Sequence, residues 1–318
     1  MLEVPTPAPG PGEVLLRVSA VTTCPQWDLH LKHNEPMFVG HQFHFPYAPG
    51  QPGHEATGEI AAIGAGVMAF AIGDRVSTWR DPGHHNPGCY AQYVVLDAEN
   101  IIHVPYIALP AATAPLELAA CVASVFLLLK SMNVIAGRQI GVSGLGPAGL
   151  IAVQMAKAEG AARVVAFDLA AQRRTLGEQL GVDLALDPRH ITAEQLSARP
   201  QRPLLDTTID CVGAKASVEF AMDHTRDVVA LFGVQREPYA FAPRHWHSDG
   251  GGLRLCGYSG ASRAAAEYAV QLIEQGKLDL VPLTTQHLPL DDYIQGIGLL
   301  ERQEAVKICF LPWGSPVA

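Results

Sequence analysis

A cysteine, a histidine and a glutamate stand at three separated positions in the first part of the chain, and together they could hold a zinc ion. They are Cys24, His54 and Glu117. A catalytic zinc takes three protein ligands of these types and keeps a fourth position open for substrate. Zinc bound in this way lowers the pKa of an alcohol, so that an alkoxide forms near neutral pH and gives up hydride. We therefore expect these three side chains to converge.

Other interpretations of these residues stay open. Cys121 lies one helical turn after Glu117 and is a second candidate for the third ligand. A single cysteine is often a small buried hydrophobic residue, and a glutamate at a helix start can simply complement the helix dipole. On residue type alone, the zinc site is a hypothesis.

A glycine-rich segment follows a β-type run and opens a helical one, as a dinucleotide-binding loop does. The segment is GVSGLGPAG at residues 141–149. Gly144 allows a tight turn, Gly146 lets the backbone approach a pyrophosphate, and Gly149 allows helix and strand to pack closely. The pyrophosphate would lie at the positive end of the helix. The expected cofactor-binding residues of this loop are Gly144, Gly146, Pro147, Ala148 and Gly149.

Asp168 ends the second β-type run of the same region, nineteen residues after Gly149. A carboxylate there can accept hydrogen bonds from both ribose hydroxyls and repels a 2′-phosphate. This favours NAD over NADP. Arg173 follows five residues later and could lie over the adenine. Because an arginine also attracts phosphate, it weakens the case against NADP.

Two patterns of elements must position these residues, and they predict the fold class α/β plus β. Residues 1–116 carry short β-type runs broken by glycine and proline, which predicts a barrel-like or sandwich domain. These runs are Val14–Val18, Gly58–Ile63, Arg75–Thr78 and Ala91–Val95. From residue 118 onward, helical and β-type segments alternate, which predicts βαβ units and a parallel sheet. They are Leu118–Lys130, Gln139–Ser143, Pro147–Glu159, Arg163–Phe167, Arg173–Leu180, Thr208–Val212, Val228–Phe232, Leu253–Tyr258 and Arg263–Gly276. The tail, with Leu288–Glu301 and a last strand at Val306–Leu311, could return to the first domain.

Composition disfavours several classes of partner. The chain has 318 residues and is 48% hydrophobic, which suits two domains with large cores. Its net charge is −9 with both signs interspersed, so we expect neither nucleic acid nor an anionic membrane as partner. The longest apolar run, Val122–Leu129, is too short to span a bilayer. The N-terminal residues do not resemble a signal peptide, and six cysteines without a C-x-x-C pair suit reduced thiols. We therefore expect a cytoplasmic protein.

Taken together, the motifs resemble the zinc-containing branch of the medium-chain dehydrogenase/reductase superfamily over nearly the whole chain. No single motif is specific, whereas the ordered set is. In the family's order, the matching segments are Pro9-Gly10-Pro11-Gly12-Glu13-Val14, Cys24 with Asp28 and His30, Gly53-His54-Glu55-Ala56-Thr57-Gly58, Gly73-Asp74-Arg75-Val76, Gly88-Cys89-Tyr90-Ala91-Gln92-Tyr93-Val94, Glu117 with Cys121, the Gly144–Gly149 loop, Asp168 with Arg173, Asp210-Cys211-Val212-Gly213 and Gly276-Lys277-Leu278.

The resemblance implies a GroES-like β domain of residues 1–117, completed by residues 258–318. A doubly wound Rossmann domain with a parallel sheet, residues 118–257, is inserted between them. It also implies a cleft in which a catalytic zinc faces the nicotinamide of NAD, and homodimers or homotetramers. The sorbitol- or threonine-dehydrogenase-like branch fits best, because sorbitol-type enzymes have a glutamate third ligand where Glu117 stands. Glu55 matches a residue behind the metal, and His30 matches a residue that carries the proton.

The chain departs from the family pattern in four places. The segment from Cys24 to His30 is one residue longer, and Gln26 stands where a hydroxyl would begin a proton relay. The long loop before His54 contains three histidines that we expect to be loop or pocket residues, namely His33, His41 and His44. The four-cysteine lobe that holds a structural zinc is absent, so we expect one zinc. The family's first strand is largely missing, so we expect a fragment or a misplaced start, with an exposed sheet edge.

The sequence therefore predicts a zinc-dependent dehydrogenase that moves hydride between a secondary alcohol or polyol and NAD, with a small alcohol or ketone as partner. Aromatic residues that could line its pocket, or simply pack in the core, are Trp27, Tyr47, Trp79 and Tyr90. The alternatives are a zinc-free NAD(P)H quinone or enoyl reductase of the same fold and a non-catalytic dinucleotide-binding protein. The presence of Cys24 and His54 speaks against both.

Overall fold

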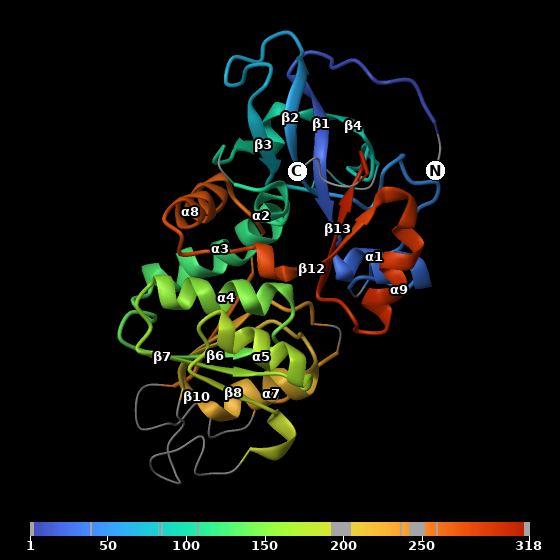
Figure 1. Ribbon diagram of the computed structural model, residues 1–318. Coiled ribbons are helices and arrows are strands. Elements are labelled where there is room, and N and C mark those ends of the chain that lie inside the picture. Colours follow the sequence, from blue (N-terminus) through green and yellow to red (C-terminus); the bar gives the residue numbers. More distant parts are fainter. Residues whose placement is uncertain are drawn as a thin grey trace. The chain divides into compact units, whose positions relative to one another are not determined.

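The chain forms two compact units (Figure 1). The computed structural model describes residues 3–314, except for 39, 82, 84, 107, 192–204, 236, 242–251 and 259. The first unit contains residues 1–121, 261–274 and 279–318, and the second contains residues 122–260 and 275–278. The C-terminal part of the chain therefore belongs to the same unit as the N-terminal part.

A mixed sheet forms the frame of the first unit. Within the described residues it has seven strands, in the order β12-β13-β1-β2-β3-β5 with β4 also paired to β1. They are β1 (Glu13–Thr22), β2 (Glu55–Ile63), β3 (Arg75–Thr78), β4 (Tyr93–Asp97), β5 (Ile101–His103), β12 (Thr284–Pro289) and β13 (Lys307–Leu311). β1 runs antiparallel to β2, β4 and β13. The last strand thus pairs with the first, close to the end of β1 that leads to Cys24.

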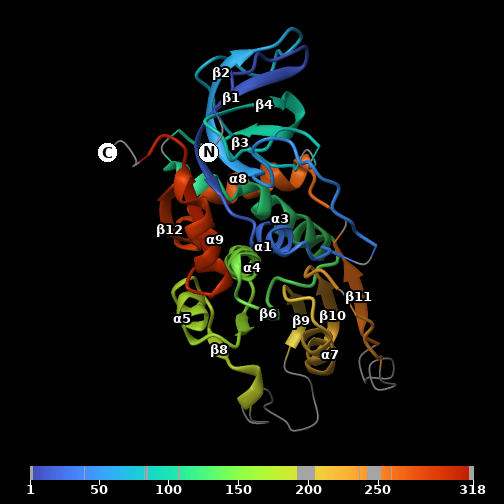
Figure 2. The same cartoon turned by 90° about the vertical axis from the view of Figure 1, so that its right-hand side faces the viewer.

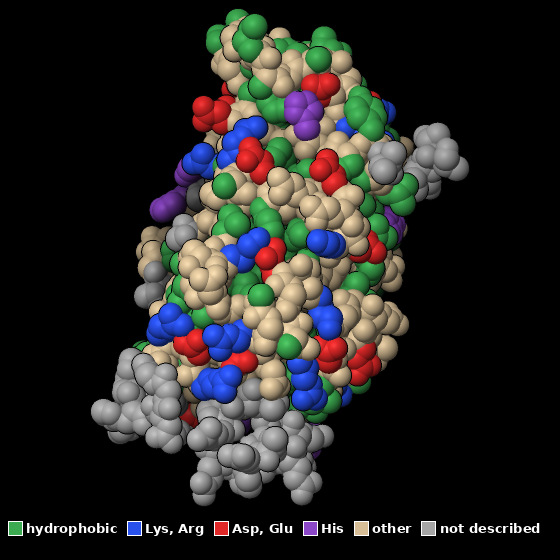
Figure 3. Space-filling view, turned by 90° about the vertical axis from the view of Figure 1, so that its left-hand side faces the viewer, with side chains coloured by type: hydrophobic (Ala, Val, Ile, Leu, Met, Phe, Trp, Pro, Cys, Tyr) green, Lys and Arg blue, Asp and Glu red, His purple; other side chains and the backbone are tan. Residues whose placement is uncertain are grey.

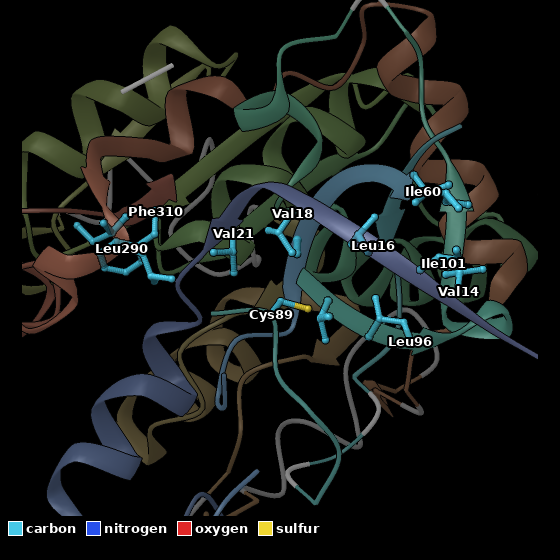
Figure 4. Packing of buried hydrophobic residues seen from close by; sticks show 14 of the residues in the cluster. Val14, Leu16, Val18, Val21, Ile60, Cys89, Leu96, Ile101, Leu290 and Phe310 are labelled. Carbon is cyan, nitrogen blue, oxygen red and sulfur yellow. The ribbon is translucent and has the colours of Figure 1, made fainter. Parts of the chain in front are cut away.

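The apolar side chains of these strands fill one core (Figure 4). Alternate residues of β1, among them Leu16 and Val18, are fully buried, as a strand with one face on a core requires. Ile60 and Ile101 from neighbouring strands pack with them, and Phe310 extends the core into the C-terminal segment. The core therefore ties the return segment to the N-terminal strands.

A parallel sheet forms the second unit. Within the described residues it has six strands in the order β11-β10-β9-β6-β7-β8. They are β6 (Gln139–Ser143), β7 (Arg163–Phe167), β8 (Leu184–Leu186), β9 (Leu205–Asp210), β10 (Thr225–Leu231) and β11 (Arg254–Gly257). The first strand of this unit is central, and the order reverses beside it. This is the doubly wound order that binds dinucleotides at the reversal point.

α-Helices connect the strands of both sheets within the described residues. They are α1 (Pro25–His33), α2 (Pro110–Thr113), α3 (Leu116–Ser131), α4 (Pro147–Ala158), α5 (Ala171–Gln179), α7 (Lys215–His224), α8 (Arg263–Glu274) and α9 (Tyr293–Glu301). The segment Pro110–Ser131 has the length and composition to cross a membrane, but 67% of its most apolar window is buried inside the protein, as in a core helix. On the face shown in Figure 3, acidic and basic side chains are interspersed.

The parallel sheet and the β unit agree with the predicted fold class, whereas several elements differ from the prediction, and two of these differences bear on the sites. α1 occupies part of the segment expected to be a loop, because Pro25 fits the first turn of a helix and Asn34 ends it with a left-handed conformation. β9 begins and ends earlier than the predicted Thr208–Val212 strand. The chain turns away after Asp210, whose carboxylate accepts a hydrogen bond from the backbone of Gly213 at 2.8 Å.

Candidate metal centre and dinucleotide loop

His54 is held with one ring nitrogen facing the other predicted ligands. Its Nδ1 atom lies 2.8 Å from the carbonyl oxygen of Pro52, which can only accept a hydrogen bond. Nδ1 therefore donates, and Nε2 faces Glu117 Oε2 at 3.7 Å. Gly53 permits this turn, because a Cβ there would lie 2.7 Å from the backbone nitrogen of Tyr90. A hydrogen bond at the second nitrogen is how proteins orient metal-binding histidines.

Cys24 precedes the first residue of α1 as its N-cap, but its sulfur makes no capping hydrogen bond. The ligand atoms of Cys24, His54 and Glu55 all lie within 4.8 Å of one another. Donor atoms around a tetrahedral zinc are about 3.3–3.6 Å apart. The limit of 4.8 Å is wider than this spacing, so small side-chain movements would bring the sulfur and the imidazole onto one ion.

Glu117, in the first turn of α3, lies next to His54, although it does not belong to the group of ligand atoms within 4.8 Å of one another. Its Oε2 atom is the one near His54, whereas its Oε1 atom accepts a hydrogen bond from Cys121 Sγ at 3.3 Å. Cys121 thus reaches the group through Glu117. Of the two candidates for the third ligand, Glu117 is the one that faces His54, and Cys121 contacts Glu117.

Glu55 has a buried partner that the sequence analysis missed. Lys307 in β13 has no exposed surface, and its Nζ atom lies 2.6 Å from the Glu55 carboxylate. Nζ also donates to the carbonyl oxygen of Thr23, and the Thr22 hydroxyl donates to Glu55 at 3.1 Å. A lysine inside an otherwise apolar strand was the signal that could have revealed it, because such a charge needs a buried partner.

Burial and charge act against each other in this group. Burial raises the pKa of the Glu117 carboxyl, and the charge of Glu55 raises it further, although His54 opposes both. Burial lowers the pKa of His54, but Cys24 and Glu117 outweigh it and hold this pKa well above its usual range. Glu117 and His54 thus hold their protons more tightly than usual, and a divalent cation bound here would displace these protons and balance the charge. One thiol, one imidazole and a carboxylate are also the donors that zinc prefers, so the residues fit a zinc ion.

Other predicted site residues lie outside this group of ligand atoms. His30 is buried in α1, and its Nδ1 atom lies 3.1 Å from the Glu35 carbonyl oxygen. Trp79 is buried and donates to the Glu99 carbonyl at 2.9 Å, so it packs inside the unit. Tyr90 donates to the carboxylate of Asp28, discussed below.

The three loop histidines do not join the ligand group either. His33 lies 2.6 Å from Glu301 in an ion pair at the surface. His41 accepts a hydrogen bond from the Met37 backbone at 3.2 Å and packs edge-on against Trp27, with ring centroids 5.7 Å apart. His44 is exposed.

The glycine-rich loop has the geometry that its sequence predicts. Gly144 has a φ of +85°, which only glycine adopts easily. A Cβ on Gly149 would lie 1.8 Å from the Gly144 carbonyl oxygen, so the helix can start here only with glycine. Gly146 is the N-cap of α4 and has no atom within 4 Å of its Cβ position, which leaves its backbone open to a phosphate. Pro147 and Ala148 begin the first turn of α4; because proline has no N–H, the amides left for a phosphate there are those of Ala148 and Gly149.

Asp168 lies at the end of β7, beside this loop. Its two carboxylate oxygens accept hydrogen bonds from the backbone of Leu145 at 2.7 Å and of Ala170 at 2.8 Å. Arg173 Nη1 lies 4.0 Å from the same carboxylate. Arg174, which the sequence analysis did not name, donates to the Asp168 carbonyl at 2.7 Å. The carboxylate is therefore fixed next to the phosphate-binding turn.

Comparison with known proteins identifies the family of both domains. Residues 10–106 match the alcohol dehydrogenase GroES-like domain, and residues 147–275 match the zinc-binding dehydrogenase domain. An alcohol dehydrogenase of Rhizobium meliloti (strain 1021) is 32% identical, over 73% of this chain and 72% of that protein. A sorbitol dehydrogenase of Gallus gallus is 28% identical, over 96% of this chain and 90% of that protein.

A solved structure of similar fold comes from Sinorhizobium meliloti 1021. It is a zinc-binding dehydrogenase bound to NADP, with a TM-score of 0.81 and 26% identity, covering 97% of this chain and 94% of that one. The chain therefore belongs to the zinc-containing medium-chain dehydrogenase/reductase family of NAD(P)-linked alcohol and polyol dehydrogenases, as the two domain matches and the identity to the R. meliloti enzyme show.

Proposed function

We propose that the protein reversibly oxidises a secondary alcohol or polyol to a ketone with NAD, at one zinc ion held by Cys24, His54 and Glu117. The observation that carries this proposal is the proximity of a half-buried thiol to a buried imidazole and buried carboxylates. Zinc supplies a Lewis acid that lowers the pKa of the alcohol. The match to a sorbitol dehydrogenase supports a polyol among the candidate substrates.

Charge balance favours Glu117 over Glu55 as the third ligand. Glu55 is already neutralised by Lys307 at 2.6 Å. Glu117 and a Cys24 thiolate together would carry two negative charges, which balance the two positive charges of Zn²⁺. This balance matters because an uncompensated charge at a buried site is costly. Glu55 then supports the site from behind.

Proton transfer falls to His30 in this proposal. The amide of Gln26 cannot act as an acid or base near neutral pH. The Nδ1 atom of His30 is engaged with the Glu35 carbonyl oxygen, so Nε2 is the atom that would take up and release the proton.

We infer that NAD is preferred to NADP, because the fixed Asp168 carboxylate would repel a 2′-phosphate. We also propose a single zinc. Among the described residues, only Cys24, His54 and Glu55 form a group of three or more such side chains with ligand atoms this close. Residues 118–257 would be the nucleotide-binding domain between the catalytic parts 1–117 and 258–318. We further propose that the protein is cytoplasmic and forms a homodimer or homotetramer.

Elemental analysis tests the proposal first. Purified protein should contain about one zinc per chain, and Cys24→Ala should lose it. Cys256→Ala, which removes a half-buried thiol in β11, should keep it. The zinc-loaded protein should then form NADH from secondary alcohols. A protein without zinc after expression in zinc-rich medium would contradict the proposal and leave the zinc-free reductase as the better interpretation.

A further inference from the structure

A buried carboxylate lies directly behind Cys24 and has three hydrogen-bond donors. Asp28, in the first half of α1, is 1% exposed. It accepts hydrogen bonds from the Cys24 backbone nitrogen at 2.9 Å, from the Tyr90 hydroxyl at 3.0 Å and from the Tyr293 hydroxyl at 2.7 Å. These donors come from three separate segments of the first unit. Asp28 therefore joins the start of α1 to two distant parts of the chain.

The hydrogen bond from the Cys24 backbone to Asp28 stabilises the start of α1 without using the cysteine side chain. The N-cap side chain of a helix usually accepts a hydrogen bond from the first turn, but a zinc ligand must keep its side chain free for the metal. Cys24 makes no such bond with its sulfur. Asp28 instead reaches back and accepts from the Cys24 amide, as the acidic partner does in a capping box. This fixes the Cys24 backbone while leaving the sulfur free.

Tyr90 connects Asp28 with the loop that carries His54. The backbone nitrogen of Tyr90 donates to the Gly50 carbonyl at 3.0 Å, and that of Cys89 donates to the Gly53 carbonyl at 2.7 Å. Tyr90 also lies against Gly53, the residue before His54. The path from Cys24 through Asp28 and Tyr90 thus ends next to His54. It joins the loops of two zinc ligands without passing through the ion.

Tyr293 connects Asp28 with α9 in the C-terminal return segment. Its ring packs with that of Tyr90, with centroids 4.9 Å apart, and both rings contact Phe310 in the core. α1 and α9 lie side by side (Figure 2), and Glu301 of α9 pairs with Lys32 of α1 at 2.5 Å. Because neither the ring contacts nor the ion pair between the two helices involves a tyrosine hydroxyl, loss of a hydroxyl should leave this packing in place.

We propose that Tyr90 and Tyr293 are positioning residues for the zinc centre, which act by holding Asp28 against the backbone of Cys24. The inference rests on the proposed zinc site. The two hydroxyls orient the Asp28 carboxylate, the carboxylate fixes the Cys24 amide, and the sulfur is thereby placed relative to His54. Groups behind metal ligands typically change metal affinity by about 10- to 100-fold. The two tyrosines should therefore set the zinc affinity without touching the metal.

Phenylalanine variants test this, because they remove only the hydroxyls. Tyr90→Phe, Tyr293→Phe and the double variant are compared with Tyr106→Phe, which loses a hydrogen bond of 2.7 Å to Gly73 elsewhere in the same unit. Zinc affinity is measured by competition with a chelator. The cobalt-loaded proteins are compared by their thiolate-to-cobalt absorption band, which reports the sulfur's position. We expect each single variant to bind zinc about 10-fold more weakly and to alter the band, and the control to do neither.

The outcomes separate the inference from the proposed function. A wild-type protein that binds no zinc would overturn the proposed function. A wild-type protein that binds one zinc, with tyrosine variants of unchanged affinity and unchanged cobalt band, would overturn only the inference, even if their melting temperatures fall. If the double variant does not fold, the two single variants decide.

Discussion

Replacing Lys307 by methionine should destabilise the first unit far more than the loss of an ordinary ion pair. The side chains of Lys307 and Glu55 are 0% and 1% exposed, and their charged atoms are 2.6 Å apart. Methionine fills a similar volume but leaves the Glu55 carboxylate buried without its counter-charge. Removing one partner of a buried pair costs about 3–5 kcal/mol. We expect the free energy of unfolding to fall by that amount.

Two further variants locate the cause of the loss. In Lys307→Met with Glu55→Gln, no charge remains to be compensated, so most of the lost stability should return, to within about 1–2 kcal/mol of wild type. Lys157→Met removes an ion pair with Asp183 of comparable length, 2.9 Å, in which each side chain is 37% exposed. Solvent screens that pair, so its loss should cost less than about 1 kcal/mol.

Urea denaturation with chelator present measures these differences without a contribution from zinc. Tryptophan fluorescence is a suitable probe, because Trp27, Trp79 and Trp313 all belong to the first unit. The reasoning would be refuted if Lys307→Met lost no more stability than Lys157→Met. It would also be refuted if the double variant were as unstable as the single one, because the loss would then come from packing.

Three other predictions concern the two sites. Gly149→Ala should weaken NAD binding at least about 10-fold, because its Cβ would lie 1.8 Å from the Gly144 carbonyl oxygen. Gly257→Ala, whose Cβ would have no atom within 4 Å, should leave NAD binding unchanged. Equal NAD affinities of the two variants in a titration would contradict this prediction. Zinc affinity should fall at least about tenfold per pH unit as the pH drops below the raised pKa of His54, because the bound proton must leave first; an affinity that is constant between pH 8 and 6 would argue against this ligand. Glu117→Gln should weaken zinc binding more than about 100-fold and Cys121→Ala less than about 10-fold; the reverse order would make Cys121 the third ligand.

The fold was largely predictable because its periodic patterns are local. The strands at 75–78, 139–143 and 163–167 have the predicted bounds, since each is a short apolar or β-branched run between turn residues. α1 was missed because its sequence, PQWDLHLKH, has little apolar periodicity. That helix depends on Pro25 at its start and on tertiary contacts with α9, and neither gives a hydrophobic pattern.

The residues that we propose as zinc ligands could be selected from residue type, and the residues that support them could not. Cys24, His54 and Glu117 carry the chemistry of zinc binding in their side chains, so a search for donors finds them. Lys307 and Tyr293 are ordinary residues of a strand and a helix, separated from their partners by 252 and 265 positions. Only the return of the chain to the first unit brings them to the metal centre, and spacing in the sequence does not encode that return.

The C-terminal segment thereby has a role beyond completing a sheet. β13 supplies Lys307, which neutralises Glu55, and α9 supplies Tyr293, which holds Asp28 behind Cys24. In the proposed site, where Glu55 is already neutralised by Lys307, a Cys24 thiolate and Glu117 would carry the two negative charges that one divalent cation balances. Without the segment, Glu55 would add a third negative charge, and Asp28 would lose one of the two tyrosine hydroxyls that hold it against the backbone of Cys24. The proposed zinc centre would therefore reach its balanced charge only after the last strand has paired with the first, so we expect metal affinity and the docking of the C-terminal segment to be coupled.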